Sequence, residues 1–162
     1  MPINRQQLLD NRPEGEATAS NFKLVSSETR ALNDNDVLVR HHFLSLDPYM
    51  RGRMNDSKSY AVPQPLGQVM QGGAAGEVIE SRDPKYAVGD KVVGFGGWQE
   101  YSVVDASAPG ALKKVDTTHI LSSCLTPACL AARIHLSTSE RICDSISAGG
   151  VPAATQALAW HW

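Results

Sequence analysis

The sequence predicts a mainly β fold, built as a small, strongly curved and partly open barrel with short helices. The strongest strand-like run covers residues 36–46 and is rich in Val, Leu and Phe. Shorter β-rich runs follow at residues 68–70, 77–79, 91–93 and 101–104. Eight of the chain's thirteen glycines lie between positions 67 and 97. Glycine at bends and bulges between short strands is typical of small, tightly curved barrels.

The first 35 residues predict two further strands separated by loops. Residues 1–19 contain Leu8 and Leu9 and then a polar stretch, which indicates a short strand followed by a loop. Residues 22–25 begin with alternating apolar and polar side chains, as a half-buried strand does. Residues 26–35 are rich in turn-forming types. We therefore expect a turn-rich connection between these strands and the long strand at residues 36–46.

Two adjacent histidines, His41 and His42, lie within the long strand. Successive side chains of a strand point to opposite faces of the sheet. The two imidazoles therefore cannot ligate one metal ion, and we expect a structural or solvent-facing role for each.

The segment after this strand is the first candidate for a functional site, because sites are often placed on loops at strand ends. Pro48 fixes its own φ and disfavours helix at Asp47, so the chain should bend there. Tyr49 would then lie on a stiff corner, with an apolar ring and a hydroxyl donor. The alternative is an ordinary surface turn with Tyr49 packed sideways. Tyr60 lies in the polar loop that follows, at residues 55–64, and either lines a substrate entrance or is an ordinary exposed residue.

Length and composition indicate one soluble domain with a core and a small appendage. The chain has 162 residues, 42% of them hydrophobic and 20% charged, and a formal net charge of −2. It contains no basic block, which argues against nucleic acid as a partner. It also contains no apolar run near the ~18 residues of a membrane span, and its first residues are too polar for a secretory signal. We therefore predict a cytoplasmic protein that binds neither nucleic acid nor membrane.

The cysteines and the glycine tract indicate neither a disulfide framework nor a nucleotide loop. The three cysteines, at positions 124, 129 and 143, are odd in number, and their spacing fits no common zinc pattern. The Gly-Gly-Ala-Ala-Gly tract at residues 72–76 precedes a strand-like run, whereas a phosphate-binding loop precedes a helix. We interpret the tract as a bend of the barrel. No strand–Gly-x-Gly-x-x-Gly–helix unit occurs in the sequence, so a Rossmann domain is expected to be absent.

Residues 44–54, Leu-Ser-Leu-Asp-Pro-Tyr-Met-Arg-Gly-Arg-Met, resemble a signature of the zinc-independent medium-chain dehydrogenase/reductases. The similarity is to the NADPH-dependent alkenal/enone reductase family, the group of leukotriene B4 12-hydroxydehydrogenase, prostaglandin reductase, plant double-bond reductases and bacterial curcumin reductase. It extends to residues 12–16, 21–22 and 67–105, and covers roughly residues 5–120. The resemblance implies that residues 1–120 form a GroES-like barrel, the catalytic, substrate-side domain of such enzymes.

The resemblance also implies a reaction. In the family, NADPH delivers hydride to the β-carbon of a small-molecule enal or enone, and the negative charge that builds on the carbonyl oxygen needs hydrogen-bond donors. With a reference pKa near ~10, Tyr49 is protonated at pH 7 and is the predicted catalytic donor. The predicted substrate-binding residues are Tyr49, Met50 and Tyr60. Arg51 and Arg53 would hold the corner by salt bridges or, alternatively, meet acidic substrate tails.

Zinc is not expected. Members of the superfamily that use zinc place a cysteine after the long strand and a His-Glu pair further on. This sequence has Leu-Asp-Pro at residues 46–48 and Leu-Gly-Gln at residues 66–68, and neither tripeptide offers a thiolate or an imidazole. A reaction without a Lewis-acid metal favours reduction of a conjugated C=C bond over alcohol dehydrogenation.

The resemblance ends after residue 120, and residues 121–162 form a divergent tail. We hypothesise that this tail is read in a shifted frame, and we expect it to be partly helical, around residues 127–136. Because the NADP-binding domain of the family has no counterpart in the sequence, the chain is expected to be inactive alone, and whether it is an enzyme stays open. The alternative is a non-catalytic GroES-like barrel that acts as an oligomeric or binding module. In either case exposed apolar surface favours a homo-oligomer.

Overall fold

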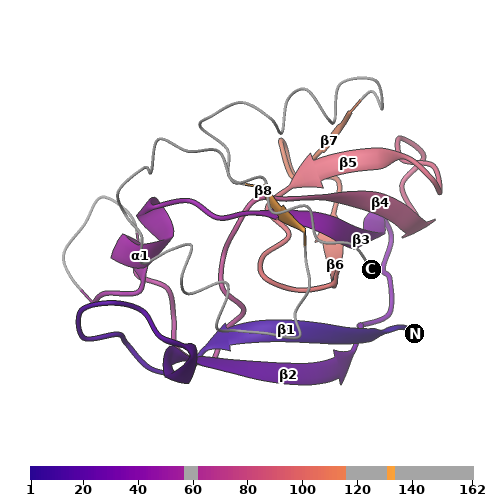
Figure 1. Ribbon diagram of the computed structural model, residues 1–162. Coiled ribbons are helices and arrows are strands. Elements are labelled where there is room, and N and C mark those ends of the chain that lie inside the picture. The colour runs from indigo at the N-terminus through magenta and orange to yellow at the C-terminus, as the bar shows by residue number, and fades with distance from the viewer. Residues whose placement is uncertain (57–61, 116–130, 134–162) are drawn as a thin grey trace.

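The computed structural model describes residues 1–56, 62–115 and 131–133, which form two antiparallel sheets and two short helices (Figure 1). In chain order the elements are β1 (Ile3–Leu9), the 3-10 helix η1 (Ala19–Asn21), β2 (Phe22–Glu28), β3 (Asp36–Ser45), α1 (Tyr49–Arg53), β4 (Ala74–Ser81), β5 (Lys91–Gly94), β6 (Tyr101–Asp105), β7 (Leu112–Lys114) and β8 (Ala131–Arg133). The predicted mainly β fold is confirmed, and its curled sheet is that of a GroES-like partial barrel.

The larger sheet is organised around β3. Its strand order is β6-β3-β4-β5-β7, and β8 also pairs with β3. The pairing of β3 with β4 shifts register twice, between Leu38 and Val39 and between His41 and Phe43. Such bulges bend a strand and increase its twist, so they curl the sheet towards a barrel.

The smaller sheet, β1–β2, partly closes the barrel (Figure 1). Single backbone bridges join β1 to two segments next to the larger sheet, Gln6 to Gln99 and Leu8 to Val69. Around them the amide of Gln7 donates to the Trp98 carbonyl at 2.9 Å. These bonds connect β1 to bends of the chain rather than to a full neighbouring strand, so the barrel stays partly open.

Two apolar clusters fill the domain. One lies inside the curled sheet and consists of Val37, Val39, Val78, Val92, Ala106 and Leu112. The other joins the small sheet to α1 and consists of Leu9, Ala17, Phe22, Leu44, Leu46, Met50, Met54, Met70 and Trp98. The second cluster positions the candidate site, because Met50 of α1 and Met54, the residue that follows it at the helix end, are buried in it.

The predicted tail helix is wrong at residues 131–133, which form strand β8. β8 pairs with β3 in the register Phe43–Arg133, Leu44–Ala132 and Ser45–Ala131. The pairing of β3 with β6 ends at Arg40, so this end of β3 has backbone groups that need another partner. The need of these β3 backbone groups for hydrogen-bond partners outweighs the weak helical pattern of the tail sequence. The other residues of the predicted helix lie outside the described ranges.

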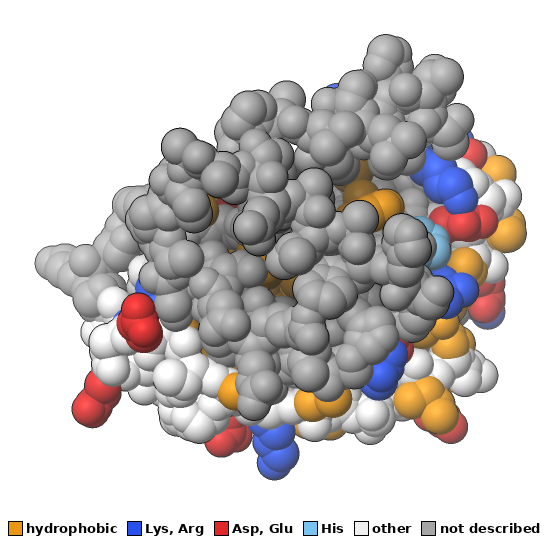
Figure 2. Space-filling model, viewed as in Figure 1, with side chains coloured by type: hydrophobic (Ala, Val, Ile, Leu, Met, Phe, Trp, Pro, Cys, Tyr) orange, Lys and Arg blue, Asp and Glu red, His pale blue; other side chains and the backbone are white. Residues whose placement is uncertain are grey.

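The described surface carries charges of both signs. On the face in Figure 2, the visible acidic and basic side chains are interspersed rather than gathered by sign. Among the described residues, no helix is long and apolar enough to cross a membrane.

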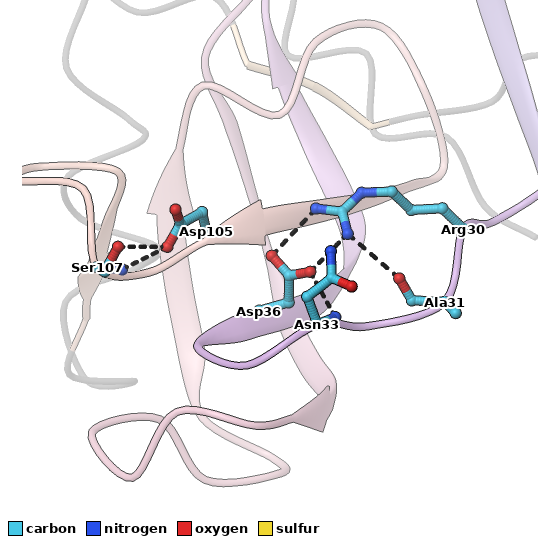
Figure 3. Close-up of polar contacts among 6 residues, drawn as sticks. All are labelled: Arg30, Ala31, Asn33, Asp36, Asp105 and Ser107. Carbon is cyan, nitrogen blue, oxygen red and sulfur yellow. Dashed lines mark hydrogen bonds and ion pairs between the residues drawn. The ribbon is translucent and has the colours of Figure 1, made fainter.

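The loop that leads into β3 is fixed by Asp36, which is 3% exposed (Figure 3). Its carboxylate accepts two hydrogen bonds from the Arg30 guanidinium, at 2.5 and 3.0 Å, and one from the Asn33 amide at 2.8 Å. The Arg30 hydrogen bonds hold the pKa of Asp36 below its usual value. Across the ladder, Asp105 is the register partner of Asp36 and accepts from Ser107 instead.

We predict that Asp36→Asn lowers the free energy of unfolding by about 2 kcal/mol, because the amide cannot accept both Arg30 bonds and the Asn33 bond at a buried position. Chemical denaturation measures the loss. Asp105→Asn is the matched control, and we expect it to change stability by less than about 0.5 kcal/mol, since its remaining oxygen still accepts from Ser107. Equal losses in the two variants would contradict this explanation.

Candidate functional site

The candidate site is the corner after β3, where Pro48 begins a one-turn helix. Pro48 has φ −56° and ψ −30° and is the N-cap of α1. The missing amide of a proline costs nothing at the start of a helix. The predicted bend is therefore present, but the residues after it form helix α1 rather than an irregular turn. The Ser45 hydroxyl donates to the Asp47 carboxylate at 2.9 Å and steadies the bend.

Side chains four residues apart lie on the same face of a helix, so α1 places Met50 and Met54 on one face and Tyr49 and Arg53 on another. Met50 and Met54 are 1% and 0% exposed and belong to the Trp98 core cluster. Tyr49, one position before Met50, is 38% exposed. The two methionines therefore anchor the helix, and Tyr49 lies at the surface. The role of Met50 as a wall of the substrate pocket stays a prediction; in this structure its side chain is enclosed by the core.

Tyr49 shares its side of α1 with Arg53. The guanidinium carbon of Arg53 lies 5.3 Å from the centre of the Tyr49 ring, a cation–π distance. Arg53 Nη1 also donates to Gln71 Oε1 at 3.2 Å. The tyrosine that the sequence analysis selects as the candidate donor thus has the guanidinium of Arg53, four residues later on α1, over its ring.

Arg51 and Arg12 fasten α1 to the loop before η1. Arg51 donates to the carbonyls of Gly15 and Pro13, at 3.1 Å from Nε and 3.3 Å from Nη2, and Arg12 donates to the Met54 carbonyl at 2.7 Å. Arg51 thus holds the corner within the described residues through hydrogen bonds to carbonyl oxygens and, at 2.6 Å, to Asn55 Oδ1, rather than through the predicted salt bridge. These contacts bring together the two family-like stretches at residues 12–16 and 44–54.

Gln64 fastens the other side of the corner and is 2% exposed. Its backbone amide donates to the Arg53 carbonyl at 2.7 Å. Its side chain donates to the Val69 carbonyl at 3.0 Å and accepts from the Gln71 backbone amide at 3.2 Å. Sequence reasoning missed this residue, because a glutamine between two prolines in a polar loop gives no signal of burial. Tyr60 lies outside the described residues, so its predicted place at the substrate entrance stays a prediction.

Comparison with known proteins identifies the domain. Residues 5–112 match the family model described as the N-terminal domain of oxidoreductase. The chain belongs to this family. The resemblance to the alkenal/enone reductases is confirmed by its relatives. NADPH-dependent curcumin reductase of Escherichia coli is 45% identical over 100 residues, which are 62% of this chain and 29% of the relative.

A plant relative and a solved structure agree. The NADP(+)-dependent 2-alkenal reductase of Nicotiana tabacum is 36% identical over 105 residues, covering 62% of this chain and 31% of the relative. The structure of CurA from Vibrio vulnificus in complex with NADPH matches with a TM-score of 0.64 and 40% identity, over 71% of this chain and 34% of that chain. The chain thus spans about a third of the length of the proteins that it matches.

The described part of this oxidoreductase domain contains no metal cluster: no three His, Cys, Asp or Glu side chains in it are placed to hold an ion. Zinc independence itself stays a prediction.

The glycine tract at residues 72–76 does not fit a nucleotide pyrophosphate. The tract at residues 72–76 runs into β4, as predicted, and no helix begins there. A Cβ on Gly76 would lie 2.1 Å from the Arg40 carbonyl oxygen, so this glycine permits close β3–β4 packing. The glycines here serve the barrel and leave no helix N-terminus for phosphate.

The two histidines of β3 have different surroundings, as strand alternation predicts. His41 is 7% exposed, and its Nε2 lies 2.7 Å from the Ser102 hydroxyl, while the His42 side chain is 39% exposed. A Cβ on Gly96 would lie 2.3 Å from the His41 ring, so only glycine fits above it. Burial, together with the smaller effect of the nearby His42, lowers the pKa of His41 to about 4. His41 is therefore a neutral core residue.

We predict that stability falls as the pH is lowered from about 6.5 to about 4. In this window the unfolded chain protonates His41, while the folded domain keeps it neutral, so the unfolded state binds more protons. The slope from this residue approaches about 1.4 kcal/mol per pH unit. Denaturant unfolding at a series of pH values measures it. His41→Asn should flatten the slope, whereas the matched variant His42→Asn should keep it; an unchanged slope in His41→Asn would refute the assignment.

Proposed function

We propose that this chain is the substrate-side domain of an NADPH-dependent reductase that reduces the C=C bond of α,β-unsaturated aldehydes and ketones. The observation that carries the proposal is the α1 corner, where a tyrosine that is 38% exposed is held on a helix whose other face is packed in the core. Membership of the oxidoreductase domain family and the similarity to curcumin and 2-alkenal reductases support it.

The role that we assign to Tyr49 follows from where charge develops. Reduction of a conjugated C=C bond places negative charge on the carbonyl oxygen, and a neutral phenol can donate a hydrogen bond to it without transferring a proton early. Such a donor is effective only if it does not have to reorganise. Met50 and Met54 on one face of α1, and Arg51 towards the Gly15 carbonyl, provide that fixed position.

We further propose that the chain is inactive without a nucleotide-binding partner domain. This proposal is supported by the glycine tract at residues 72–76, which runs into β4 and offers no helix N-terminus to a pyrophosphate. A non-catalytic barrel that self-associates is the second candidate. It is favoured by exposed apolar side chains at Phe95, 80% exposed, and Val62, 79% exposed.

A chimera tests the proposed function. Residues 5–112 of this chain would replace the matching segment of the E. coli curcumin reductase, and NADPH oxidation would be followed with an enone as substrate. We predict turnover, with kcat lowered about 100-fold by Tyr49→Phe, as for loss of one oxyanion donor. Tyr86→Phe is the matched control: its hydroxyl bonds the Leu112 carbonyl at 2.7 Å in another part of the barrel, and activity should be unchanged.

The same assay on the 162-residue chain should show no turnover, and fluorescence titration should show no saturable NADPH binding up to millimolar concentration. A folded but inactive chimera, or full activity of its Tyr49→Phe variant, would overturn the proposed reaction or the role of Tyr49. Saturable micromolar binding of NADPH by the chain alone would overturn the proposed need for a partner domain.

A further inference from the structure

Arg53 is placed differently from the other arginine of α1. Arg51 points to the loop before η1, where its guanidinium bonds the Gly15 carbonyl. Arg53 lies over the Tyr49 ring, with 5.3 Å between its guanidinium carbon and the ring centre. Two arginines that are two residues apart on one short helix thus have separate tasks, one against backbone and one against the candidate catalytic side chain.

The Arg53 guanidinium is held in place from the loop opposite α1. Its Nη1 donates to Gln71 Oε1 at 3.2 Å. The Gln71 amide in turn donates to the side chain of buried Gln64 at 3.2 Å, and the Gln64 amide donates to the Arg53 carbonyl at 2.7 Å. The three residues form a closed network from helix to loop and back, so the position of the guanidinium is coupled to two backbone segments.

Part of the Arg53 side chain is enclosed. Its Nε is shielded from solvent and has no hydrogen-bond partner in the described residues. In a fully exposed arginine, water would accept a hydrogen bond from this N–H. A shielded N–H without an acceptor costs free energy, which a mobile, solvent-exposed side chain would avoid. The contacts that compensate are the Tyr49 ring and Gln71. The geometry therefore favours a specific arrangement over a mobile surface cation.

A cation beside a phenol changes the strength of the hydrogen bond that the phenol hydroxyl donates. A positive charge within about 4–6 Å favours the state in which the neighbouring oxygen carries negative charge. It therefore strengthens the hydrogen bond that the hydroxyl donates to an acceptor gaining negative charge. The cation–π contact also restricts the ring, which lowers the cost of ordering it when a ligand binds.

We propose that Arg53 is a positioning residue for Tyr49: tethered by Gln71, its guanidinium fixes the Tyr49 ring on α1 and strengthens the hydroxyl as a donor to the substrate carbonyl oxygen. This inference rests on the proposed function, in which Tyr49 is that donor. Arg53 does not itself have to touch the substrate.

The test is a pH titration of the chain labelled with 13C at the tyrosine ζ-carbon, followed by NMR. The sequence contains four tyrosines, and Tyr49→Phe identifies the signal of Tyr49. With Arg53→Gln, the midpoint of Tyr49 ionisation should move upward by about half a pH unit, because the stabilising cation is gone. Arg53→Lys should retain most of the effect of the charge. Arg51→Gln is the matched control from the same helix and should leave the midpoint in place.

A second variant covers the case in which Arg53→Gln does not fold. Gln71→Ala alters an exposed side chain and releases the tether, so it should move the Tyr49 midpoint in the same direction by a smaller amount. A midpoint that is the same in the parent, Arg53→Gln and Gln71→Ala would overturn the proposal, as would an equal shift in Arg51→Gln.

The titration tests the coupling of Arg53 to Tyr49, and the chimera assay tests the proposed function, so a negative result in one leaves the other unaffected. An inactive chimera together with a Tyr49 midpoint that depends on Arg53 would overturn the proposed function and leave the coupling of the two side chains. An active chimera with no dependence on Arg53 would overturn only this inference.

Discussion

The packing of Trp98 on Phe22 is the contact on which the arrangement of the site depends. The ring centres are 5.4 Å apart and the planes are inclined by 28°, an offset stack within the cluster that joins the small sheet to α1. Trp98 is 0% exposed and is held by backbone bonds on both sides, from its amide to the Met70 carbonyl at 2.8 Å and from the Gln7 amide to its own carbonyl at 2.9 Å. Because Met50 packs in this same cluster, the orientation of α1, and with it Tyr49, follows from the core.

The site is therefore packed on its inner side and partly exposed on its outer side. Met50 and Met54 are buried, Arg51 is bonded to the carbonyls of the preceding loop, and Gln64 closes the far side. Tyr49 keeps 38% of its surface exposed. In the proposed role of Tyr49 as a hydrogen-bond donor, the buried methionines on the other face of α1 would hold the donor in place before the substrate binds, as electrostatic stabilisation of a developing charge requires.

Much of this arrangement could be predicted from the sequence because it is encoded locally. The long apolar run specifies β3, Pro48 specifies the bend, and the run after the glycine tract shows that residues 72–76 enter a strand. The one-turn helix after Pro48 was not evident, since five residues with a glycine among them are too few for a periodic pattern. The same shortness concealed that Met50 faces the core while its neighbour Tyr49 faces outward.

The features that sequence reasoning missed are long-range. Strand β8 forms because the far end of β3 has unpaired backbone groups, and the tail sequence by itself favours helix there. The tether from Gln71 to Arg53 joins residues 18 positions apart through a loop whose conformation is set by Gln64. Neither the acceptor of an arginine nor the burial of a loop glutamine can be inferred from hydrophobic periodicity, which records only the faces of regular elements.

The most direct test of the central claim is to locate where an enone binds the chain. Amide and tyrosine-ring NMR signals of the 15N- and 13C-labelled chain would be followed during titration with cyclohex-2-enone. If the α1 corner is the substrate side, the concentration-dependent shifts will centre on Tyr49 and the adjoining residues of α1 and will be lost in Tyr49→Phe. Shifts that centre on another part of the barrel, or that persist unchanged in Tyr49→Phe, would contradict the account.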